Sequence, residues 1–214
     1  MIVVGVTGSL ASGKSGAARI FKKLGAEVFD ADLSAKRITR KGTPIHRAIV
    51  RIFGKSYLKK NGELDRQKLA LRVFNHPGDL KKLNVLIHPG VIFDFLERVK
   101  KSKGKKKMWV LDVPLLFESK METIADVTVV ISAKESVILR RAEKRGYPEK
   151  LARKILGSQW PLSKKEALAD FVIDNNGTVK QLEKRVKRVF NLIKGSKRVS
   201  GYAGKRVGSH SLTR

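Results

Sequence analysis

The chain has 214 residues, of which 42% are hydrophobic, which is enough for one globular core and too many for wholesale disorder. Its 47 Lys and Arg outnumber its 19 Asp and Glu, and the net charge of +28 indicates polyanionic partners such as nucleotides, nucleic acid or acidic lipid. The absence of cysteine excludes disulfides, thiolate nucleophiles and cysteine-ligated metals, and it fits a cytoplasmic protein.

Three further features limit the location of the protein and the kind of site it can hold. The histidines show no metal-ligand spacing, so no zinc site is expected (His46, His76, His88 and His210). The longest apolar stretch, 108–117, is about half the length of a membrane-spanning helix and contains an aspartate, so no membrane-crossing segment is expected. An apolar strand that starts at Ile2 leaves no room for a signal peptide before it.

The chain opens with a β-branched apolar run, Ile2 to Val6, which predicts a buried parallel strand. The stretch "GVTGSLASGKSG" (5–16) follows it directly. This stretch matches the phosphate-loop pattern G-x-x-x-x-G-K-[ST] at Gly8, Gly13, Lys14 and Ser15. Apolar residues at helical spacing over 17–24, with a stop at Gly25, predict the helix that such a loop requires.

Each part of this loop has a role in binding a nucleoside triphosphate. Glycines allow the backbone to approach a phosphate closely, and the amides at a helix N-terminus then bind the anion. Lys14 is expected to reach the β- and γ-phosphates, and the Ser15 hydroxyl is expected to bind Mg²⁺. A glycine-rich loop without a ligand is the alternative.

The next stretch, "EVFDAD" (27–32), predicts a short strand that ends at two acids, Asp30 and Asp32. An acid at this edge of the sheet can orient an acceptor hydroxyl or take its proton during phosphoryl transfer. Capping of the following helix is the alternative function of these two acids. Thr43-Pro44 then predicts the start of a helix, and 54–64 is rich in turn residues.

A helical block occupies the middle of the chain. Asp65 and Asp79 are predicted helix caps, and Pro89 is predicted to start a further helix that runs into the lysine-rich segment 98–107. Because the block from about 44 to 107 contains no strand, we expect it to be an insertion over the carboxyl edge of the sheet, where ligands bind in such folds.

Strands return at 108–113, 126–131 and 170–174, with two basic helical segments between 133 and 157 that are broken at Gly146-Tyr147-Pro148. Strands that alternate with helices predict an α/β fold with a doubly wound, parallel, five-stranded sheet. A final helix is predicted after a cap at Thr178. The residues from 195 to 214 lack periodicity and contain five basic residues and no acid, which predicts a disordered tail able to contact nucleic acid nonspecifically.

Two of these later segments contain candidate catalytic groups. Asp112 lies in a predicted buried strand, where an unpaired carboxylate is costly, so a role near Mg²⁺ is favoured over a strand-end hydrogen bond. The segment "ILRRAEKRG" (138–146) offers guanidinium groups that stabilise a transferring phosphoryl group, although in so basic a chain a solvated face is the alternative.

Six stretches, in this order and spacing, resemble the dephospho-CoA kinase family over about residues 1–194: "VGVTGSLASGKS", "FDADLSAKRI", "NVLIHPGV", "VLDVPLLFE", "RRAEKRG" and "GSQWPLSKKEALADFVIDNNGT". The resemblance implies transfer of the γ-phosphate of ATP to the ribose 3′-hydroxyl of dephospho-CoA. It also implies a P-loop kinase fold with a core (1–43 and 108–194), a helical CoA-binding insertion (about 44–107) and a lid (about 138–157).

The resemblance also implies roles for particular residues. It makes 11–16 the ATP phosphate site, with Ala11, Ser12 and Gly16 beside the motif residues. Asp32 becomes the catalytic base with Thr7 near the substrate. Arg141 becomes the lid arginine that contacts phosphate. Arg145 is a second and weaker candidate for that role. The segment "DNNG" (174–177), including Asn176, is placed by the adenine, and His88 either binds substrate or only packs.

This chain departs from the family pattern within the loop. Ser9 and Ala11 stand where the family usually has more glycine, and Gly16 stands where it usually has threonine. The missing hydroxyl removes one possible contact to the α-phosphate, so ATP affinity is expected to be weaker. The alternatives to this assignment are another small-molecule kinase for nucleosides or nucleotides, and a basic nucleic-acid-binding protein with a vestigial nucleotide site. The last is disfavoured because only 7% of residues are aromatic.

Overall fold

The computed structural model describes residues 1–102 and 108–195, so the end of the lysine-rich segment and the tail from 196 lie outside the described residues. The chain divides into two compact units. One takes in Met1–Phe29 and Gly104–Arg214, and the other takes in Asp30–Lys103. The lysine run and the tail were predicted as a basic helix end and a disordered segment, and those predictions remain untested where the description stops.

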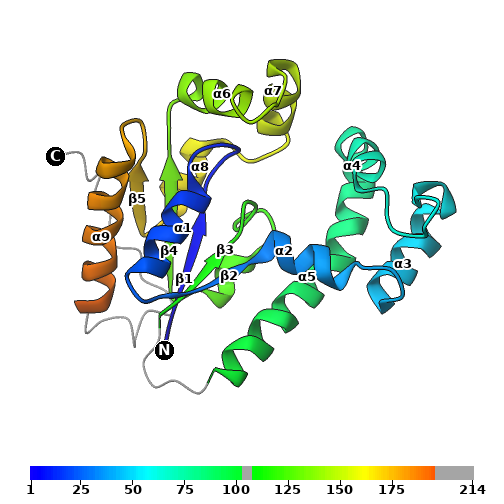
Figure 1. Ribbon diagram of the computed structural model, residues 1–214, viewed down its shortest axis with the longest axis horizontal. Coiled ribbons are helices and arrows are strands. Elements are labelled where there is room, and N and C mark those ends of the chain that lie inside the picture. Colours follow the sequence, from blue (N-terminus) through cyan, green and yellow to red (C-terminus); the bar gives the residue numbers. More distant parts are fainter. Residues whose placement is uncertain (103–107, 196–214) are drawn as a thin grey trace. The chain divides into compact units, whose positions relative to one another are not determined.

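The first unit contains a parallel sheet of five strands in the order β2-β3-β1-β4-β5 (Figure 1). The strands are β1 (Ile2–Thr7), β2 (Glu27–Asp30), β3 (Met108–Asp112), β4 (Val127–Ser132) and β5 (Phe171–Asp174). Register fixes the candidate residues relative to each other, because Val6 pairs with Asp112 and Ser132 pairs with Asp174. The predicted parallel five-stranded sheet is therefore confirmed.

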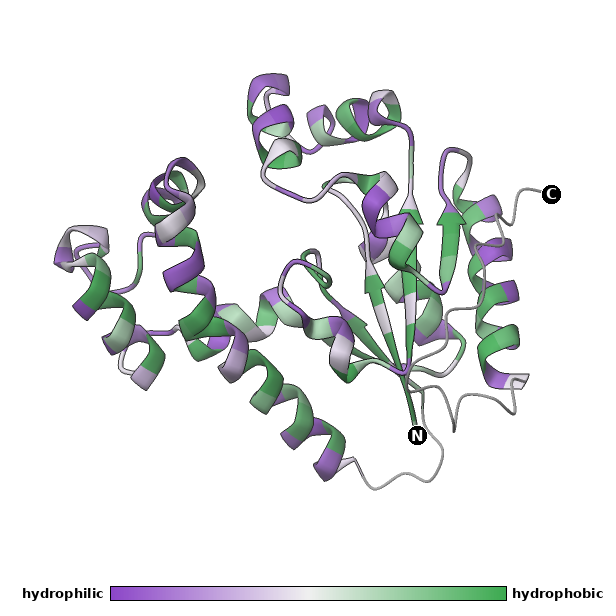
Figure 2. Ribbon diagram, turned by 180° about the vertical axis from the view of Figure 1, so that it is seen from behind, coloured by the Kyte–Doolittle hydropathy of each residue, from purple (hydrophilic) through white to green (hydrophobic). Residues whose placement is uncertain are grey.

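Helices cover this sheet on the sides where its strands are apolar. The helices α1 (Lys14–Lys23) and α9 (Val179–Gly195) pack on each other and on the sheet around a core that includes Phe21, Val129 and Phe190. In Figure 2 the strands are mostly hydrophobic in colour, whereas α9 alternates along its length between hydrophobic and hydrophilic. The predicted cap of α9 is confirmed, since the Thr178 hydroxyl accepts a hydrogen bond from the Gln181 amide at 3.3 Å.

Further helices of this unit follow β3 and β4. They are η2 (Met121–Ile124), α6 (Glu135–Glu143), α7 (Glu149–Gly157) and α8 (Leu162–Leu168). The predicted break at 146–148 is confirmed, because α6 ends before it and α7 begins after it. The helix α8, which contacts β4, was not predicted from the sequence.

The second unit is helical and consists of α2 (Ala31–Ile38), α3 (Pro44–Phe53), η1 (Lys55–Tyr57), α4 (Arg66–Asn75) and α5 (Pro77–Lys101). Two predicted caps are confirmed here. The Thr43 hydroxyl accepts from the His46 amide at 3.1 Å, and the Asp65 carboxylate accepts from the Lys68 amide at 3.0 Å. A small apolar core around Ile49, Leu64 and Leu69 joins these helices.

The helix predicted to begin at Pro89 is wrong, because Pro89 lies inside the continuous helix α5. A proline there removes one backbone hydrogen bond and normally kinks or ends a helix. Apolar side chains on both sides of it are packed, among them Leu86 before it and Val91 and Phe95 after it, and this packing overrides the local signal. The cap predicted at Asp79 is also wrong, since Asp79 lies in the first turn of α5 and pairs with Arg72 at 2.7 Å.

Candidate active site

The phosphate-loop motif forms the strand–loop–helix unit predicted for it, with β1 before the loop and α1 after it. Two glycines are required by close packing. A Cβ on Gly8 would lie 2.6 Å from the Ile131 carbonyl oxygen, and a Cβ on Gly13 would lie 2.0 Å from Nδ2 of Asn175. Gly13 also has a φ of 101°, and Ala11 a φ of 53°, both in the left-handed region. Ala11 therefore occupies a conformation that favours glycine.

Lys14 and Asp112 form an ion pair in which both side chains are largely buried, at 12% and 5% exposure. This contact supplies the cation that the buried carboxylate of Asp112 requires. Asp112 is the last residue of β3 and Lys14 the first of α1, so the pair lies at the carboxyl edge of the sheet. Ser15 is exposed in the first turn of the same helix.

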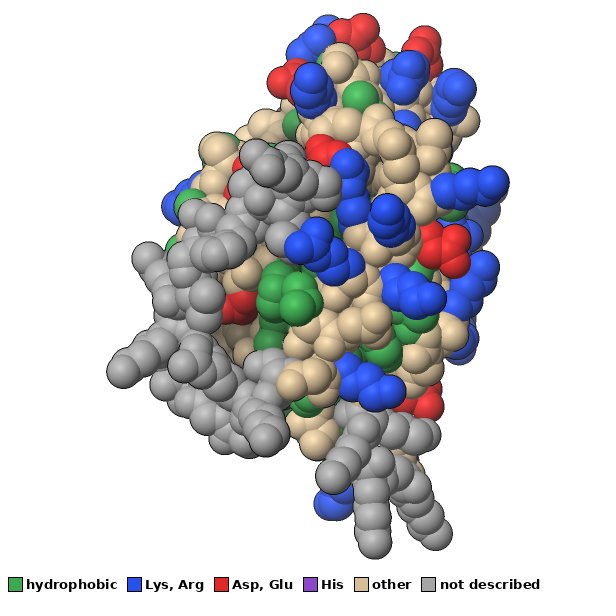
Figure 3. All heavy atoms as spheres, turned by 90° about the vertical axis from the view of Figure 1, so that its left-hand side faces the viewer, with side chains coloured by type: hydrophobic (Ala, Val, Ile, Leu, Met, Phe, Trp, Pro, Cys, Tyr) green, Lys and Arg blue, Asp and Glu red, His purple; other side chains and the backbone are tan. Residues whose placement is uncertain are grey.

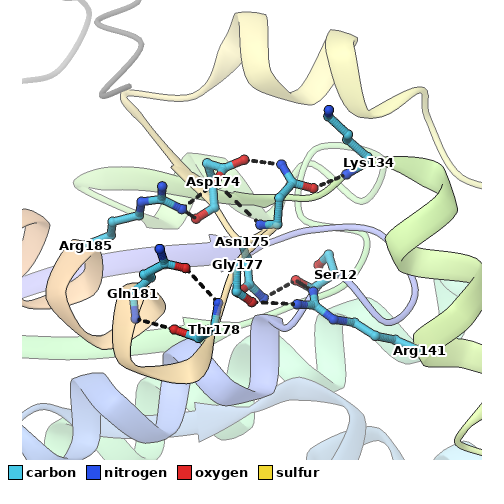
Figure 4. Close-up of polar contacts among 10 residues, drawn as sticks. Ser12, Lys134, Arg141, Asp174, Asn175, Gly177, Thr178, Gln181 and Arg185 are labelled. Carbon is cyan, nitrogen blue, oxygen red and sulfur yellow. Dashed lines mark hydrogen bonds and ion pairs between the residues drawn. The ribbon is translucent and has the colours of Figure 1, made fainter. Parts of the chain in front are cut away.

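The Ser12 carbonyl receives hydrogen bonds from two distant parts of the chain (Figure 4). Nδ2 of Asn175 donates to it at 2.7 Å, and Nη1 of Arg141 donates at 3.5 Å. Within the part of the chain that the structure describes, the buried Ser12 hydroxyl has no hydrogen-bond partner. A phosphate oxygen is a suitable acceptor for such a hydroxyl.

Arg141, predicted to be the lid arginine, lies on α6 and is brought to the loop, whereas Arg145 is exposed in the turn after α6. Besides Ser12, the Arg141 guanidinium donates to the Gly177 carbonyl at 3.5 Å. Burial, with the nearby charges of Arg140 and Arg145, lowers the pKa of Arg141 from its usual value. The guanidinium stays charged, and its partial desolvation strengthens its attraction for an anion.

The segment 174–177 contacts the loop, α6 and α9, as Figure 4 shows. The Asn176 side chain accepts from the Lys134 amide at 2.7 Å and donates to the Asp174 carboxylate. Asn175 belongs to the segment that the resemblance places by the adenine, but its buried contact with the loop was missed by sequence reasoning, which singled out only Asn176 within that segment. Its position directly after β5, at the edge where the loop lies, is the signal that could have found it.

A second network connects α8 with Thr7, the last residue of β1 before the loop. Lys165 is fully buried and pairs with Glu118 at 2.7 Å, and the same Glu118 oxygen accepts from the Trp160 amide at 3.0 Å. Lys165 also donates to the Pro114 carbonyl at 3.2 Å, which accepts from the Thr7 hydroxyl at 3.0 Å. Thr7 was a predicted substrate-binding residue, whereas Lys165 and Glu118 were not singled out.

The remaining predicted residues belong to the second unit. Asp30 caps α2, since its carboxylate accepts from the Leu33 amide at 2.9 Å, whereas Asp32 is exposed in the first turn of that helix. The capping role considered for both acids is therefore filled by Asp30. His88 lies half-buried on α5, and burial lowers its pKa from the usual 6.5.

No group of three or more His, Cys, Asp or Glu side chains in the described ranges is arranged to hold a metal ion. Magnesium in nucleotide-binding sites commonly takes only one or two protein ligands beside phosphates and waters, so this finding leaves Ser15 and Asp112 as candidates.

Within 1–102 and 108–195, no helix combines the length and apolar character needed to cross a membrane.

The sequence matches the family model described as dephospho-CoA kinase over residues 2–181. A dephospho-CoA kinase of Geobacillus kaustophilus is 40% identical over 187 residues, which cover 86% of this chain and 93% of that protein. Among solved structures, a dephospho-CoA kinase from Campylobacter jejuni superposes with a TM-score of 0.64 at 28% identity, covering 89% and 96% of the two chains. A protein from Thermus thermophilus superposes with a TM-score of 0.78 at 30% identity, covering 91% and 98%.

Proposed function

The chain belongs to the dephospho-CoA kinase family, and from this we propose that it transfers the γ-phosphate of ATP to the ribose 3′-hydroxyl of dephospho-CoA, the last step of coenzyme A biosynthesis. Members of this family are ATP-dependent kinases. A kinase of this type needs a loop that binds the phosphates of ATP, a group that orients the acceptor hydroxyl or takes its proton, and cations that stabilise the transferred phosphoryl group.

The observation that carries the proposal is the construction of the phosphate loop. Its carbonyl at Ser12 accepts from Asn175 and Arg141. Its glycines at 8 and 13 have no room for a side chain, and Lys14 lies at its end. Oxygen atoms of the β- and γ-phosphates would accept hydrogen bonds from the loop amides and from Lys14, which then exchanges its partner Asp112 for phosphate. Asn176 and its neighbours in 174–177 would border the adenine.

Magnesium is part of this proposal. The donors present fit a hard cation, because Ser15 offers a hydroxyl near the start of α1 and Asp112 a carboxylate at the end of β3, the strand that pairs with β1. A bound Mg²⁺ would neutralise charge on the β- and γ-phosphates. The release of Asp112 from Lys14 on nucleotide binding would free that carboxylate for the cation or its waters.

Asp32 is the proposed catalytic base. Because Asp30 serves as the helix cap, Asp32 is not needed for that purpose and its carboxylate is exposed. It would orient the 3′-hydroxyl and accept its proton as the bond to phosphorus forms. Arg141 would stabilise the charge on the equatorial oxygens of the transferring group, while Arg145, Thr7 and His88 are proposed contacts of the substrates.

A coupled assay of ATP consumption with dephospho-CoA as acceptor tests the proposal. We expect turnover that requires both dephospho-CoA and Mg²⁺ and that stops at one phosphate per acceptor. Nucleosides, nucleotides and shikimate, tested as alternative acceptors, should each have a kcat/KM at least about tenfold lower than that of dephospho-CoA. This ratio is equivalent to ~1.4 kcal/mol of discrimination. Preference for one of these acceptors would assign the chain to another small-molecule kinase activity.

The rival of a different class, a nucleic-acid-binding protein with a vestigial nucleotide site, predicts salt-dependent RNA binding and no turnover with any acceptor. Contact of nucleic acid with the basic residues beyond 195 remains a prediction from composition. A cytoplasmic location is likewise proposed, since a chain without cysteine and without a described membrane-spanning helix is compatible with it.

A further inference from the structure

The first unit contains a pocket outside the candidate active site, where the edge strand β5 meets α9. Its volume is about 210 Å³. The lining residues come from these two elements alone: Val172, Ile173, Asp174, Gln181, Lys184, Arg185, Arg188 and Val189. No residue of the phosphate loop is among them. Figure 3 shows this side of the molecule, where Lys and Arg side chains surround exposed hydrophobic surface.

The pocket has an excess of positive charge. Three of the described lining residues are cationic, Lys184, Arg185 and Arg188, and Asp174 is the one acid among them. Asp174 is paired with Arg185, whose Nη1 also donates to the Asp174 carbonyl at 2.6 Å. The other two cations are four residues apart on one helix face, where like charges repel, so an anion between them would relieve that repulsion.

The inner part of the pocket is apolar. Ile173 and Val189 are almost fully buried, at 2% and 1% exposure, and Val172 is half-buried beside them. A bare inorganic anion would leave the exposed part of Val172 uncovered, and an uncharged apolar molecule would leave Lys184 and Arg188 without an anionic partner. The lining therefore suits a ligand that has an anionic group and an apolar group side by side.

We propose that this pocket binds an organic phosphate, meaning a phosphate ester with a small apolar or aromatic group. The phosphate lies between Lys184 and Arg188, because guanidinium and ammonium groups donate several hydrogen bonds to a dianionic phosphate. The apolar group lies on Val172, Ile173 and Val189. Since the pocket holds only 210 Å³, it encloses part of a larger ligand rather than the whole of one.

The pocket is also linked to the segment proposed to border adenine. Asp174, which pairs with Arg185, holds the Asn176 side chain, and Asn176 in turn accepts from the Lys134 amide (Figure 4). A phosphate bound between Lys184 and Arg188 adds negative charge beside Arg185, which would compete with Asp174 for its guanidinium and loosen this chain of contacts. We therefore expect the ligand to change the KM for ATP, a consequence that rests on the proposed function, whereas the binding itself does not.

Phenyl phosphate is the probe, used with the ¹⁵N-labelled full-length protein whose phosphate loop is first saturated with a non-hydrolysable ATP analogue and Mg²⁺. We expect amide shifts at Val172, Ile173 and the middle of α9. Inorganic phosphate and benzyl alcohol should each bind at least about tenfold more weakly, because each covers only one part of the pocket. Lys184→Ala/Arg188→Ala should weaken phenyl phosphate at least about tenfold, while circular dichroism shows an intact helix.

The matched control is Lys180→Ala/Lys187→Ala, which removes the same charge from exposed positions of α9 that do not line the pocket. It should bind phenyl phosphate within about twofold of the wild type at physiological ionic strength. If both double variants lose the same amount of affinity for phenyl phosphate, the effect comes from the net charge of the helix and not from the pocket, and the proposal is overturned. Inorganic phosphate binding as tightly as phenyl phosphate, or shifts confined to 8–15, would also overturn it, and neither result bears on the kinase assay with dephospho-CoA.

Discussion

Asn175 and Ser12 are 163 positions apart in the chain, and a buried hydrogen bond of 2.7 Å joins the amide of one to the carbonyl of the other. The same Asn175 nitrogen occupies the space that a Cβ on Gly13 would need, at 2.0 Å. The turn of the phosphate loop at 12–13 is thus shaped by the residue that follows the edge strand β5. Gly13 has two reasons to be glycine, its φ of 101° and the presence of Asn175.

Asn175→Ala should raise the KM for ATP about tenfold, because the Ser12 carbonyl would lose the closer of its two donors, and losing a buried hydrogen bond costs about 1–3 kcal/mol. Steady-state kinetics with varied ATP measures this, with thermal melting as the check on folding. Asn191→Ala, which removes an exposed amide from α9, is the control and should leave the KM unchanged. An Asn175→Ala enzyme with the wild-type KM for ATP would show that the loop keeps its shape without this contact.

Lys14→Ala should abolish phosphoryl transfer, and it should also remove the ion pair that Lys14 makes with the buried carboxylate of Asp112. Breaking a buried pair in this way costs about 3–5 kcal/mol of stability. The double variant Lys14→Met/Asp112→Asn separates the two effects. It should recover most of the melting temperature, because neither charge is left buried alone, and it should remain inactive in the coupled assay. Near wild-type turnover in Lys14→Ala would contradict the phosphate-loop assignment.

The sequence was sufficient to predict the phosphate loop, because its residues are adjacent in the chain and their spacing alone determines the strand–loop–helix unit. The five-stranded parallel sheet was predictable for a similar reason, since each strand is a short apolar run between helices. What could not be predicted are the contacts that hold the loop from outside. Asn175 and Lys165 reach it only through the packing of β5 and α8, which no local pattern encodes.

Pro89 shows the opposite failure, in which a strong local signal gave the wrong answer. A proline inside a helix is unfavourable by itself, and the sequence therefore predicted a helix start. Close packing of α3 on α5 explains the difference. A Cβ on Gly90 would lie 2.5 Å from Cδ1 of Ile45, so the two helices approach closely next to the proline. Tertiary packing on both sides of residue 89 holds α5 continuous.

Lys165→Met should destabilise the protein strongly, because Glu118 would be left without its ammonium partner, and its carboxylate is only 14% exposed. A loss of about 3–5 kcal/mol corresponds to a fall in melting temperature of about 6–20 °C for a chain of this size. Lys165→Met/Glu118→Gln should recover part of that loss. If the single and double variants melt at the same temperature, the pair contributes nothing to stability.

His88 should make stability depend on pH. Burial lowers its pKa in the folded protein below the usual 6.5, so the unfolded chain binds more protons between these two values. Stability contributed by neutral His88 is therefore fully present above 6.5 and is lost as the pH falls through the window below it. Comparing melting temperatures at about pH 8 and about pH 5.5 should show a smaller fall in His88→Gln than in the wild type. An equal fall would mean that other groups cause it.

Asp32→Asn tests the proposed base, with Asp30→Asn, two residues earlier at the end of β2, as the matched control. Asparagine keeps the size and hydrogen-bonding capacity of aspartate but cannot accept a proton from the acceptor hydroxyl. We expect Asp32→Asn to lower kcat by about 10²–10⁴, the usual contribution of general-base catalysis. The affinity for ATP, measured by calorimetry, should change little, because Lys14 and the loop amides are unchanged.

Asp30→Asn should behave differently, because Asp30 caps α2 through the Leu33 amide and asparagine is an equally good cap. Its kcat should stay within about threefold of the wild type, since a capping residue takes no part in proton transfer. The two acids are separated by one residue, and Asp30 alone accepts the capping hydrogen bond from the Leu33 amide, so comparing the two variants separates loss of the base from a change at the cap. Turnover of Asp32→Asn within about threefold of the wild type, with a large loss in Asp30→Asn, would transfer the role of base to Asp30. Small effects in both would remove general-base catalysis by either acid from the mechanism, and transfer would then depend on positioning and on the cations alone.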